Sequence, residues 1–181
     1  MNKRLYALLA ISLTIILSSC SFISEQKEKD IPIVHPDLSL YDTTYKVGRS
    51  DGNPFIIKAS LLEIYKDDNK AFGTDVTFIR YDENSNIELE GRADSVEINT
   101  KKDDAILSGN VIVDIKNEGL QINCDSINWD NSNSILDSND GVVNVIWDQS
   151  NSIEGYGFSG NLNTRIFELS TIKDGKINEK N

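Results

Sequence analysis

Apolar and polar residues alternate with a period of two over much of the chain beyond residue 38. The alternation is clearest over 111–116 and recurs over 120–124, 127–130 and 143–147. A period of two is typical of strands that bury one face. No window places apolar residues at the i, i+3, i+4 and i+7 positions of an amphipathic helix. The pattern therefore predicts an all-β chain.

Clusters of Asn, Asp, Ser and Gly separate the alternating segments. They occupy 102–104, 117–119, 131–134, 137–141 and 148–152. These residue types favour tight turns, because they tolerate left-handed backbone or hydrogen-bond to it. Short strands joined by such turns predict an antiparallel meander, roll or sandwich.

A weak internal repeat accompanies the turns. The stretches 60–71, 95–105 and 126–135 each begin with Ser, continue as a short apolar strand and then enter a polar turn. A fourth partial copy begins near Gly157. Repeats of this size indicate stacked hairpins, whose long sheet must fold over itself to cover its apolar face. The alternative is that any meander of strands and turns is faintly repetitive.

The N-terminal segment has a different pattern, with a basic start and an apolar run that is broken only by Ser12 and Thr14. Lys3 and Arg4 precede the apolar stretch 5–17, which ends in Leu17-Ser18-Ser19-Cys20. This order predicts that residues 1–19 are a lipoprotein signal peptide and that Cys20 is the lipid-modified first residue of the mature chain. The alternatives are a retained transmembrane anchor, although spanning needs about 20 apolar residues, and an ordinary cleavage site beside a chance Cys.

Residues 20–37 are polar and charged, and they predict a tether between the lipid and a domain at 38–178. Removal of Lys3 and Arg4 with the signal peptide takes the formal net charge from −11 to about −13. Such acidity argues against nucleic acid as a partner, because phosphate contacts need clustered Lys and Arg.

Side chains suited to catalysis or metal binding are few. The chain has one His, His35, and it lies in the predicted tether, where a general base is poorly positioned. Asp137–Gly141 is interpreted as a hairpin turn and not a calcium loop, because the Gly comes one residue early. Gly155–Gly160 is interpreted as a β-turn or bulge. No enzyme activity, cofactor or metal is therefore expected.

Cysteine content limits the covalent architecture. There are two cysteines, so acylation of Cys20 leaves Cys124 without a partner and excludes a disulfide scaffold. Cys124 is expected to be a buried, small apolar side chain.

Four phrases occur in a characteristic order: 93–99, 105–113, 120–130 and 153–158. Their succession resembles the LptC/OstA-like family of lipopolysaccharide-export proteins, over about 55–169. The resemblance implies an antiparallel β-jellyroll, or β-taco, with an apolar groove that binds acyl chains. It also implies as partners lipopolysaccharide or another glycolipid, the membrane subunits of an ABC transporter and an OstA-type periplasmic bridge protein.

Carried onto this chain, the resemblance assigns two sets of residues. The groove-lining set is Val111, Val113, Ile122, Ile127, Trp129, Val143, Val145 and Phe158. The partner-docking edge is Arg165, Ile166, Phe167 and Leu169. The usual LptC member keeps a transmembrane helix, whereas this chain carries Cys20, so the expected location is the periplasm with a lipid anchor. The family role favours the inner membrane, and the outer membrane is the alternative.

Two other functions stay open at this stage. The first is a structural or surface lipoprotein with a closed β core, which the acidic composition would suit equally well. The second is an enzyme acting on envelope polymers, although no pair of carboxylates stands out. A filled interior would favour the first of these over a lipid-binding groove.

Overall fold

The computed structural model describes residues 35–47, 55–82, 84–138, 141–148 and 150–178. The residues from His35 onward form one compact unit. The predicted signal peptide, Cys20 and most of the predicted tether lie outside the described residues, as do two residues of the 137–141 turn.

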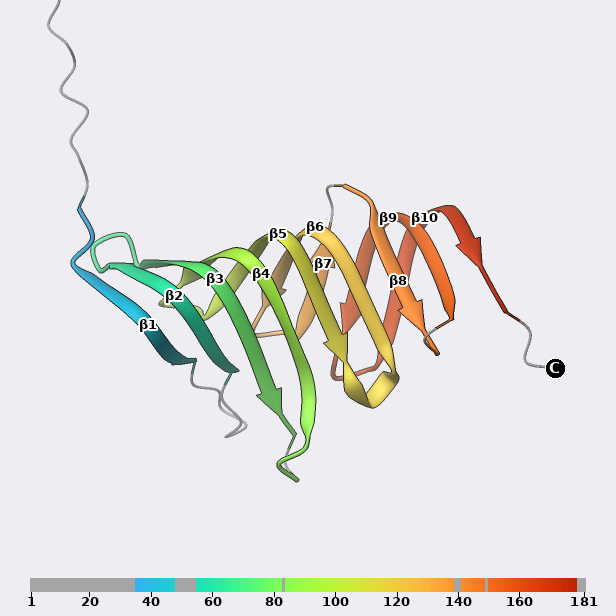
Figure 1. Ribbon diagram of the computed structural model, residues 1–181, viewed down its shortest axis with the longest axis horizontal. Helices are drawn as coiled ribbons and strands as arrows, with labels where there is room; N and C mark the ends of the chain where they lie inside the picture. Colours follow the sequence, from blue (N-terminus) through green and yellow to red (C-terminus); the bar gives the residue numbers. More distant parts are fainter. Residues whose placement is uncertain (1–34, 48–54, 83, 139–140, 149, 179–181) are drawn as a thin grey trace, which may run out of the picture. The chain divides into compact units, whose positions relative to one another are not determined.

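Within the described residues, ten strands form one antiparallel sheet, which confirms the prediction of an all-β antiparallel fold (Figure 1). The strands are β1 Leu38–Val47, β2 Phe55–Tyr65, β3 Lys70–Tyr81, β4 Ile87–Asn99, β5 Asp104–Ile115, β6 Leu120–Asp130, β7 Ile135–Ser138, β8 Val143–Trp147, β9 Asn151–Asn161 and β10 Ile166–Lys176. In the described part of the chain the helical content is one short 3-10 helix, η1, at Lys116–Glu118.

Consecutive strands are neighbours from β1 through β7, followed by β9 and β10. β7 and β8 together fill one strand position between β6 and β9. β7 pairs with the C-terminal half of β6, and β8 pairs with its N-terminal half. Among the described residues β1 and β10 are therefore the two edges of the sheet.

Each long strand bends near its middle, and the face that it buries changes phase there. In β4, Leu89 and Ala93 are buried before the bend and Val96 and Ile98 after it. The pairing between β4 and β5 shifts register between Arg92 and Ser95. Positive φ angles fall inside the strands at several of these bends, at Asp42, Asp75, Gly109, Asn110 and Gly157.

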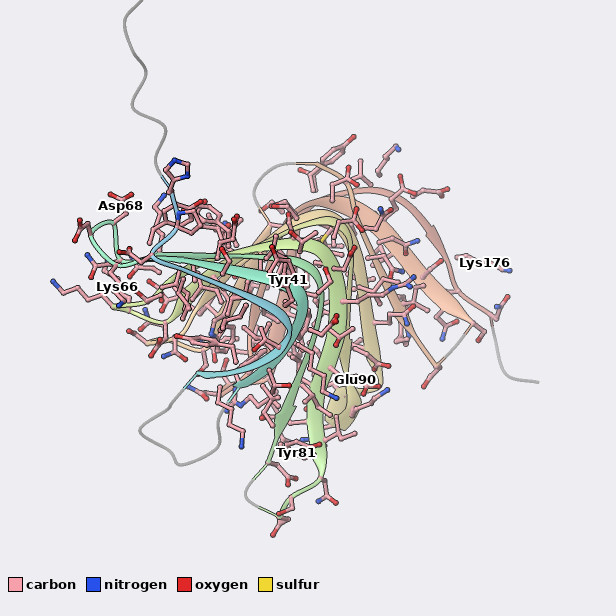
Figure 2. The ribbon with its side chains drawn as sticks, turned by 60° about the vertical axis from the view of Figure 1, so that its left-hand side comes forward. Tyr41, Lys66, Asp68, Tyr81, Glu90 and Lys176 are labelled. Atoms are coloured by element: carbon pink, nitrogen blue, oxygen red, sulfur yellow. The ribbon has the colours of Figure 1, made fainter. Side chains whose placement is uncertain are left out.

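The bends divide the sheet into two layers that face each other. Figure 2 shows the bent ribbons, with Lys66 and Asp68 at the end of one limb and Tyr81 and Glu90 on the other. Layer A comprises 43–47, 55–59, 76–81, 87–93, 111–115, 120–124, 143–147, 151–155 and 171–176. Layer B comprises 38–41, 61–65, 70–74, 95–99, 104–108, 126–130, 135–138, 158–161 and 166–169. We call the side opposite the bends, where the strand ends of both layers meet, the free side.

The structure joins two segments that the sequence pattern separates. The alternating stretches 120–124 and 127–130 are the two halves of β6. Ile122 is buried in one half and Ile127 in the other, an odd spacing that breaks strict alternation. The bend, and not a turn, causes this break, so the strands are longer than the pattern predicts.

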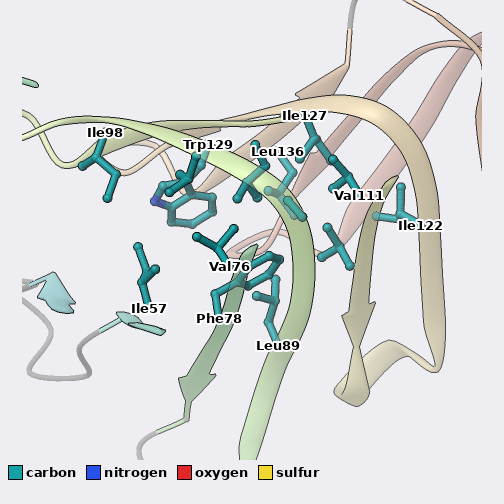
Figure 3. Packing of buried hydrophobic residues seen from close by; sticks show 14 of the residues in the cluster. Ile57, Val76, Phe78, Leu89, Ile98, Val111, Ile122, Ile127, Trp129 and Leu136 are labelled. Carbon is teal, nitrogen blue, oxygen red and sulfur yellow. The ribbon is translucent and has the colours of Figure 1, made fainter. Parts of the chain in front are cut away.

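One hydrophobic core lies between the layers. Figure 3 shows Trp129, Ile127 and Leu136 facing Phe78 and Leu89, with Val76 between them. The buried cluster extends from Ile57 in β2 to Phe158 in β9. The folded sheet thus covers its own apolar face.

Candidate functional site

The residues predicted to line a groove all lie in this core. Each has at most 7% of its surface exposed. They come from the middle of the sheet: Val111 and Val113 from β5, Ile122, Ile127 and Trp129 from β6, Val143 and Val145 from β8, and Phe158 from β9. The structure therefore brings the whole predicted set together in the apolar space between the layers.

An apolar cavity of about 30 Å³ remains within this space. It lies between the layers toward β1 and β2, with a wall that is apolar except at Asp103. Its lining residues are Phe55, Ile57, Phe78, Leu89, Val96, Ile98, Asp103, Ala105, Leu107, Trp129 and Leu136. A volume of this size has room for about one water-sized group. An acyl chain therefore needs the layers to move apart.

Aromatic side chains meet at the free side of this cavity. The ring centroid of Phe55, at the start of β2 in layer A, lies 5.5 Å from that of Trp129 in layer B. Phe55 also lies 5.9 Å from Phe78, its neighbour in layer A. An aromatic pair of this kind contributes about 0.5–1.5 kcal/mol beyond the area that it buries. Phe55 thus links the two layers where the interior would otherwise open.

Two ionisable groups lie beside the same end of the interior. Burial raises the pKa of Tyr45 on β1, and the nearby Asp103 carboxylate raises it further. Burial also raises the pKa of Asp103, with a smaller contribution from the charge of Asp104. Both shifts have the same cause, because removal from water disfavours the charged form of each group. This end of the interior is therefore a poor environment for an anion.

The residues assigned to the docking edge separate into three environments. Ile166 is 56% exposed on β10. Phe167 and Leu169 turn inward and pack against the core cluster. Arg165 lies in the turn before β10, where its Nε is 3.3 Å from Oε1 of Glu118. Ile166 is thus the one member of this set that presents an apolar side chain outward from the edge strand.

The sequence of this sheet matches a known protein family. Residues 5–175 match the family described as "Lipopolysaccharide-assembly, LptC-related". This chain belongs to that family. The match covers the sheet from β1 almost to the end of β10, so the sequence resemblance to the LptC/OstA-like proteins is confirmed. The family description names assembly of lipopolysaccharide and no catalytic activity.

A solved structure shows the same fold. The crystal structure of LptH from Pseudomonas aeruginosa, the LptA-homologous periplasmic component of its lipopolysaccharide transport device, is similar with a TM-score of 0.54. The similarity covers 70% of this chain and 96% of LptH, at 14% sequence identity. This likeness confirms the predicted β-jellyroll fold. No curated protein sequence matches the chain.

The other candidates from the sequence are His35 and the Gly155–Gly160 stretch, which includes the core residue Phe158. His35 is exposed before β1. The Gly155–Gly160 stretch lies within β9 and not in a turn between strands; a side chain at Gly155 would come within 2.2 Å of the Thr171 carbonyl oxygen of β10. Within the described ranges, no three His, Cys, Asp or Glu side chains gather as a metal site. No helix in those ranges is long and apolar enough to cross a membrane.

Cys124 is half-buried at the bend of β6 and faces the core. Burial raises the pKa of its thiol to about 11. A thiol with so high a pKa is a weak nucleophile near neutral pH, because the thiolate is scarce.

The sequence pattern did not indicate that Phe55 and Glu118 contribute to the site. Phe55 opens β2 at the limit of the family resemblance, and Glu118 lies in a polar stretch that indicated only a turn. Both residues contact partners far away in the chain, Trp129 and Arg165 respectively. A pattern along the chain carries no signal for such contacts, since they depend on how the sheet folds over.

Proposed function

We propose that this chain is a membrane-anchored periplasmic component of lipopolysaccharide or related glycolipid transport, which binds acyl chains between layers A and B. The observation that carries the proposal is the apolar core, which continues across the sheet from Ile57 in β2 to Phe158 in β9. Membership of the LptC-related family supplies the class of lipid. LptH, whose fold is similar, is a periplasmic component of such a transport device.

Burial of acyl chains provides the driving force. Each methylene that leaves water contributes about 0.8 kcal/mol. The sugar and phosphate groups of the glycolipid stay outside, because the cavity wall is apolar except at Asp103 and charged groups are costly to bury. Binding and release without bond-making are sufficient for this role.

Transfer uses the two edges of the sheet. Strands β1 and β10 each leave one side without a neighbour in the described sheet, and an exposed edge can accept a strand from another protein. We assign β10, with Ile166 outward, to the OstA-type bridge protein. The ABC transporter's membrane subunits deliver lipid at the other end. Joining edge to edge makes one continuous apolar interior across the subunits.

The anchor is the lipid on Cys20, in place of a transmembrane helix. Two or more acyl chains give stable attachment, whereas one gives marginal binding. Replacing Cys20 by Ala should abolish incorporation of labelled fatty acid and leave the precursor unprocessed. Persistent labelling of Cys20→Ala would show that the anchor is elsewhere.

The test of acyl binding is photo-crosslinking in cells. A photoreactive amino acid at Val113, which is 0% exposed and faces the interior, should form an adduct with labelled glycolipid. The matched control is position 112, the next residue of β5, whose side chain points to the outer face. Equal adducts at both positions, or none at Val113 and Trp129, would refute binding in the interior.

A second candidate function is a structural lipoprotein with a closed core. The small cavity, about 30 Å³, favours it, because the packed layers leave no room for a chain without movement. The same crosslinking experiment separates the two functions. A permanently closed core gives no glycolipid adduct from any inward position.

A further inference from the structure

Two side-chain contacts join the layers at separated places along the free side of the described residues. Toward β1 and β2, the rings of Phe55 in layer A and Trp129 in layer B lie 5.5 Å apart between centroids. Phe55 is only partly buried, whereas Trp129 is 6% exposed. The contact therefore lies at the boundary between the cavity and solvent.

Toward β10, the contact is ionic. Glu118 belongs to η1, which joins β5 to β6 at the free end of layer A. Arg165 belongs to the turn between β9 and β10, at the free end of layer B. Their side chains meet with an Nε to Oε1 distance of 3.3 Å, and the Arg165 side chain is 66% exposed. An ion pair so open to water is weak and easily separated.

These two contacts differ from those of the bends. At the bends the layers are joined by continuous backbone, so they cannot separate there. At the free side, the Phe55–Trp129 and Glu118–Arg165 contacts are made by side chains and do not involve the backbone. Separation of the layers by a hinge motion at the bends would break these contacts and leave the strand pairing intact.

We propose that Phe55–Trp129 and Glu118–Arg165 form a clasp that closes the free side and has to open for an acyl chain to pass into the interior. This inference rests on the proposed function and adds its regulation. The aromatic contact keeps water out of the interior when no acyl chain is bound. The ion pair holds the layers together near the edge at β10. An acyl chain between the layers replaces the apolar contact that Phe55 and Trp129 lose.

The test closes the clasp covalently in the full-length chain in cells. A photoreactive residue at Val113 reports the glycolipid, in a background of Cys124→Ala. Phe55→Cys and Trp129→Cys are then joined by a short, cleavable bis-maleimide. The matched control joins Thr77→Cys and Arg92→Cys, which pair directly across β3 and β4 on the outer face of layer A. Each single-cysteine variant is treated in the same way.

We expect joining of positions 55 and 129 to abolish the Val113 adduct and reduction of the linker to restore it. The control pair should keep the adduct, and each single-cysteine variant should give the same amount of adduct before and after treatment with the linker. Glu118→Gln, which removes the negative charge that pairs with the exposed Arg165, should speed adduct formation by about fivefold or less.

The outcomes separate the clasp from the function on which it rests. An adduct that persists in the chain joined at 55 and 129, as strong as in the same chain before joining, would overturn the clasp and leave acyl binding in place. Absence of the adduct from the parent chain and from every variant would overturn both proposals.

Discussion

Strands β5 and β10 are nearly equal in length, with 12 and 11 residues, but they occupy opposite environments. β5 lies in the middle of the sheet and buries Leu107, Val111, Val113 and Ile115. In β10 every residue from 170 to 176 is exposed, and Ile172 keeps 62% of its surface in water. The two strands share one sheet, so the difference comes from the presence or absence of a facing layer and a second neighbour.

This comparison separates two tasks within one fold. The central strands carry the packing free energy, which fixes the two layers around the interior. The edge strand contributes little to that packing, and its open side is available for another chain. Changes in the middle should therefore unfold the protein, whereas equivalent changes in β10 should leave it folded.

The largest expected difference comes from truncation of one isoleucine in each region. Ile122→Ala removes a side chain that is 0% exposed, and it should lower the free energy of unfolding by about 3 kcal/mol. Ile172→Ala should change it by about 0.5 kcal/mol or less, because that side chain is already in water. Urea denaturation of the mature chain measures both. Similar losses for the two variants would show that β10 is packed against a partner.

Glycines in the central and edge strands differ in the space around them. A Cβ at Gly91 in β4 would lie 2.2 Å from the Ile112 carbonyl oxygen and 2.3 Å from the Phe78 ring. At Gly175 in β10 the nearest atom would be 3.5 Å away. Gly91→Ala should therefore destabilise by about 2–3 kcal/mol through overpacking.

Gly175→Ala is the matched control and should be neutral or slightly stabilising, because it reduces the freedom of the unfolded chain. Thermal melts of the two variants provide the measurement. A stable Gly91→Ala chain would contradict the close approach of β4 to β5 that the structure shows.

Ion pairs in the central and edge regions differ in how far they are buried. Arg80 Nε lies 3.0 Å from Glu88 Oε2 at the β3–β4 end, where the side chains are 7% and 19% exposed. Lys173 Nζ lies 2.6 Å from Glu154 Oε1 beside the edge, at 51% and 34% exposed. Glu88→Gln should cost about 2 kcal/mol, because it removes one compensating charge from a buried guanidinium. Glu154→Gln should cost less than about 1 kcal/mol.

High salt provides a control for this third prediction. Screening should weaken the Lys173–Glu154 pair much more than the buried pair, since exposed charges interact through water. Equal effects of Glu88→Gln and Glu154→Gln on unfolding would mean that Arg80 does not depend on Glu88.

Much of the fold follows from the sequence, because burial on one face leaves a period of two. That pattern predicted the all-β class and, with the internal repeat, a sheet folded over itself, whereas the family resemblance assigned Val113, Ile122 and Trp129 to the interior. Strand length was harder to predict. At the bend of β6, between Ile122 and Ile127, the alternation of buried and exposed residues shifts by one position. In the sequence this shift looks like the end of one strand and the start of another.

The site was predictable only where local pattern decides it. Ile172 of β10 has the same residue type as Ile122, and its exposure depends on the order of strands in the sheet. The contact between Phe55 and Trp129 depends on how far the layers fold toward each other. Neither property has a signature within a few residues along the chain, so both required the three-dimensional structure.

The smallest effect concerns Cys124, which places a titratable group in the central region. Its folded pKa of about 11 lies above the ordinary value of 9.0, so folding favours the neutral thiol. That contribution to stability is fully present below about pH 9 and is lost as the pH rises through about 11.

At pH 8 maleimide should react with Cys124 about 100-fold more slowly than with Thr171→Cys on exposed β10, because the thiolate of Cys124 is scarce. Urea should remove the difference, since unfolding exposes both thiols equally. Equal rates in the folded chain would place the bend of β6 in water, and the contrast between centre and edge would then not extend to the bends.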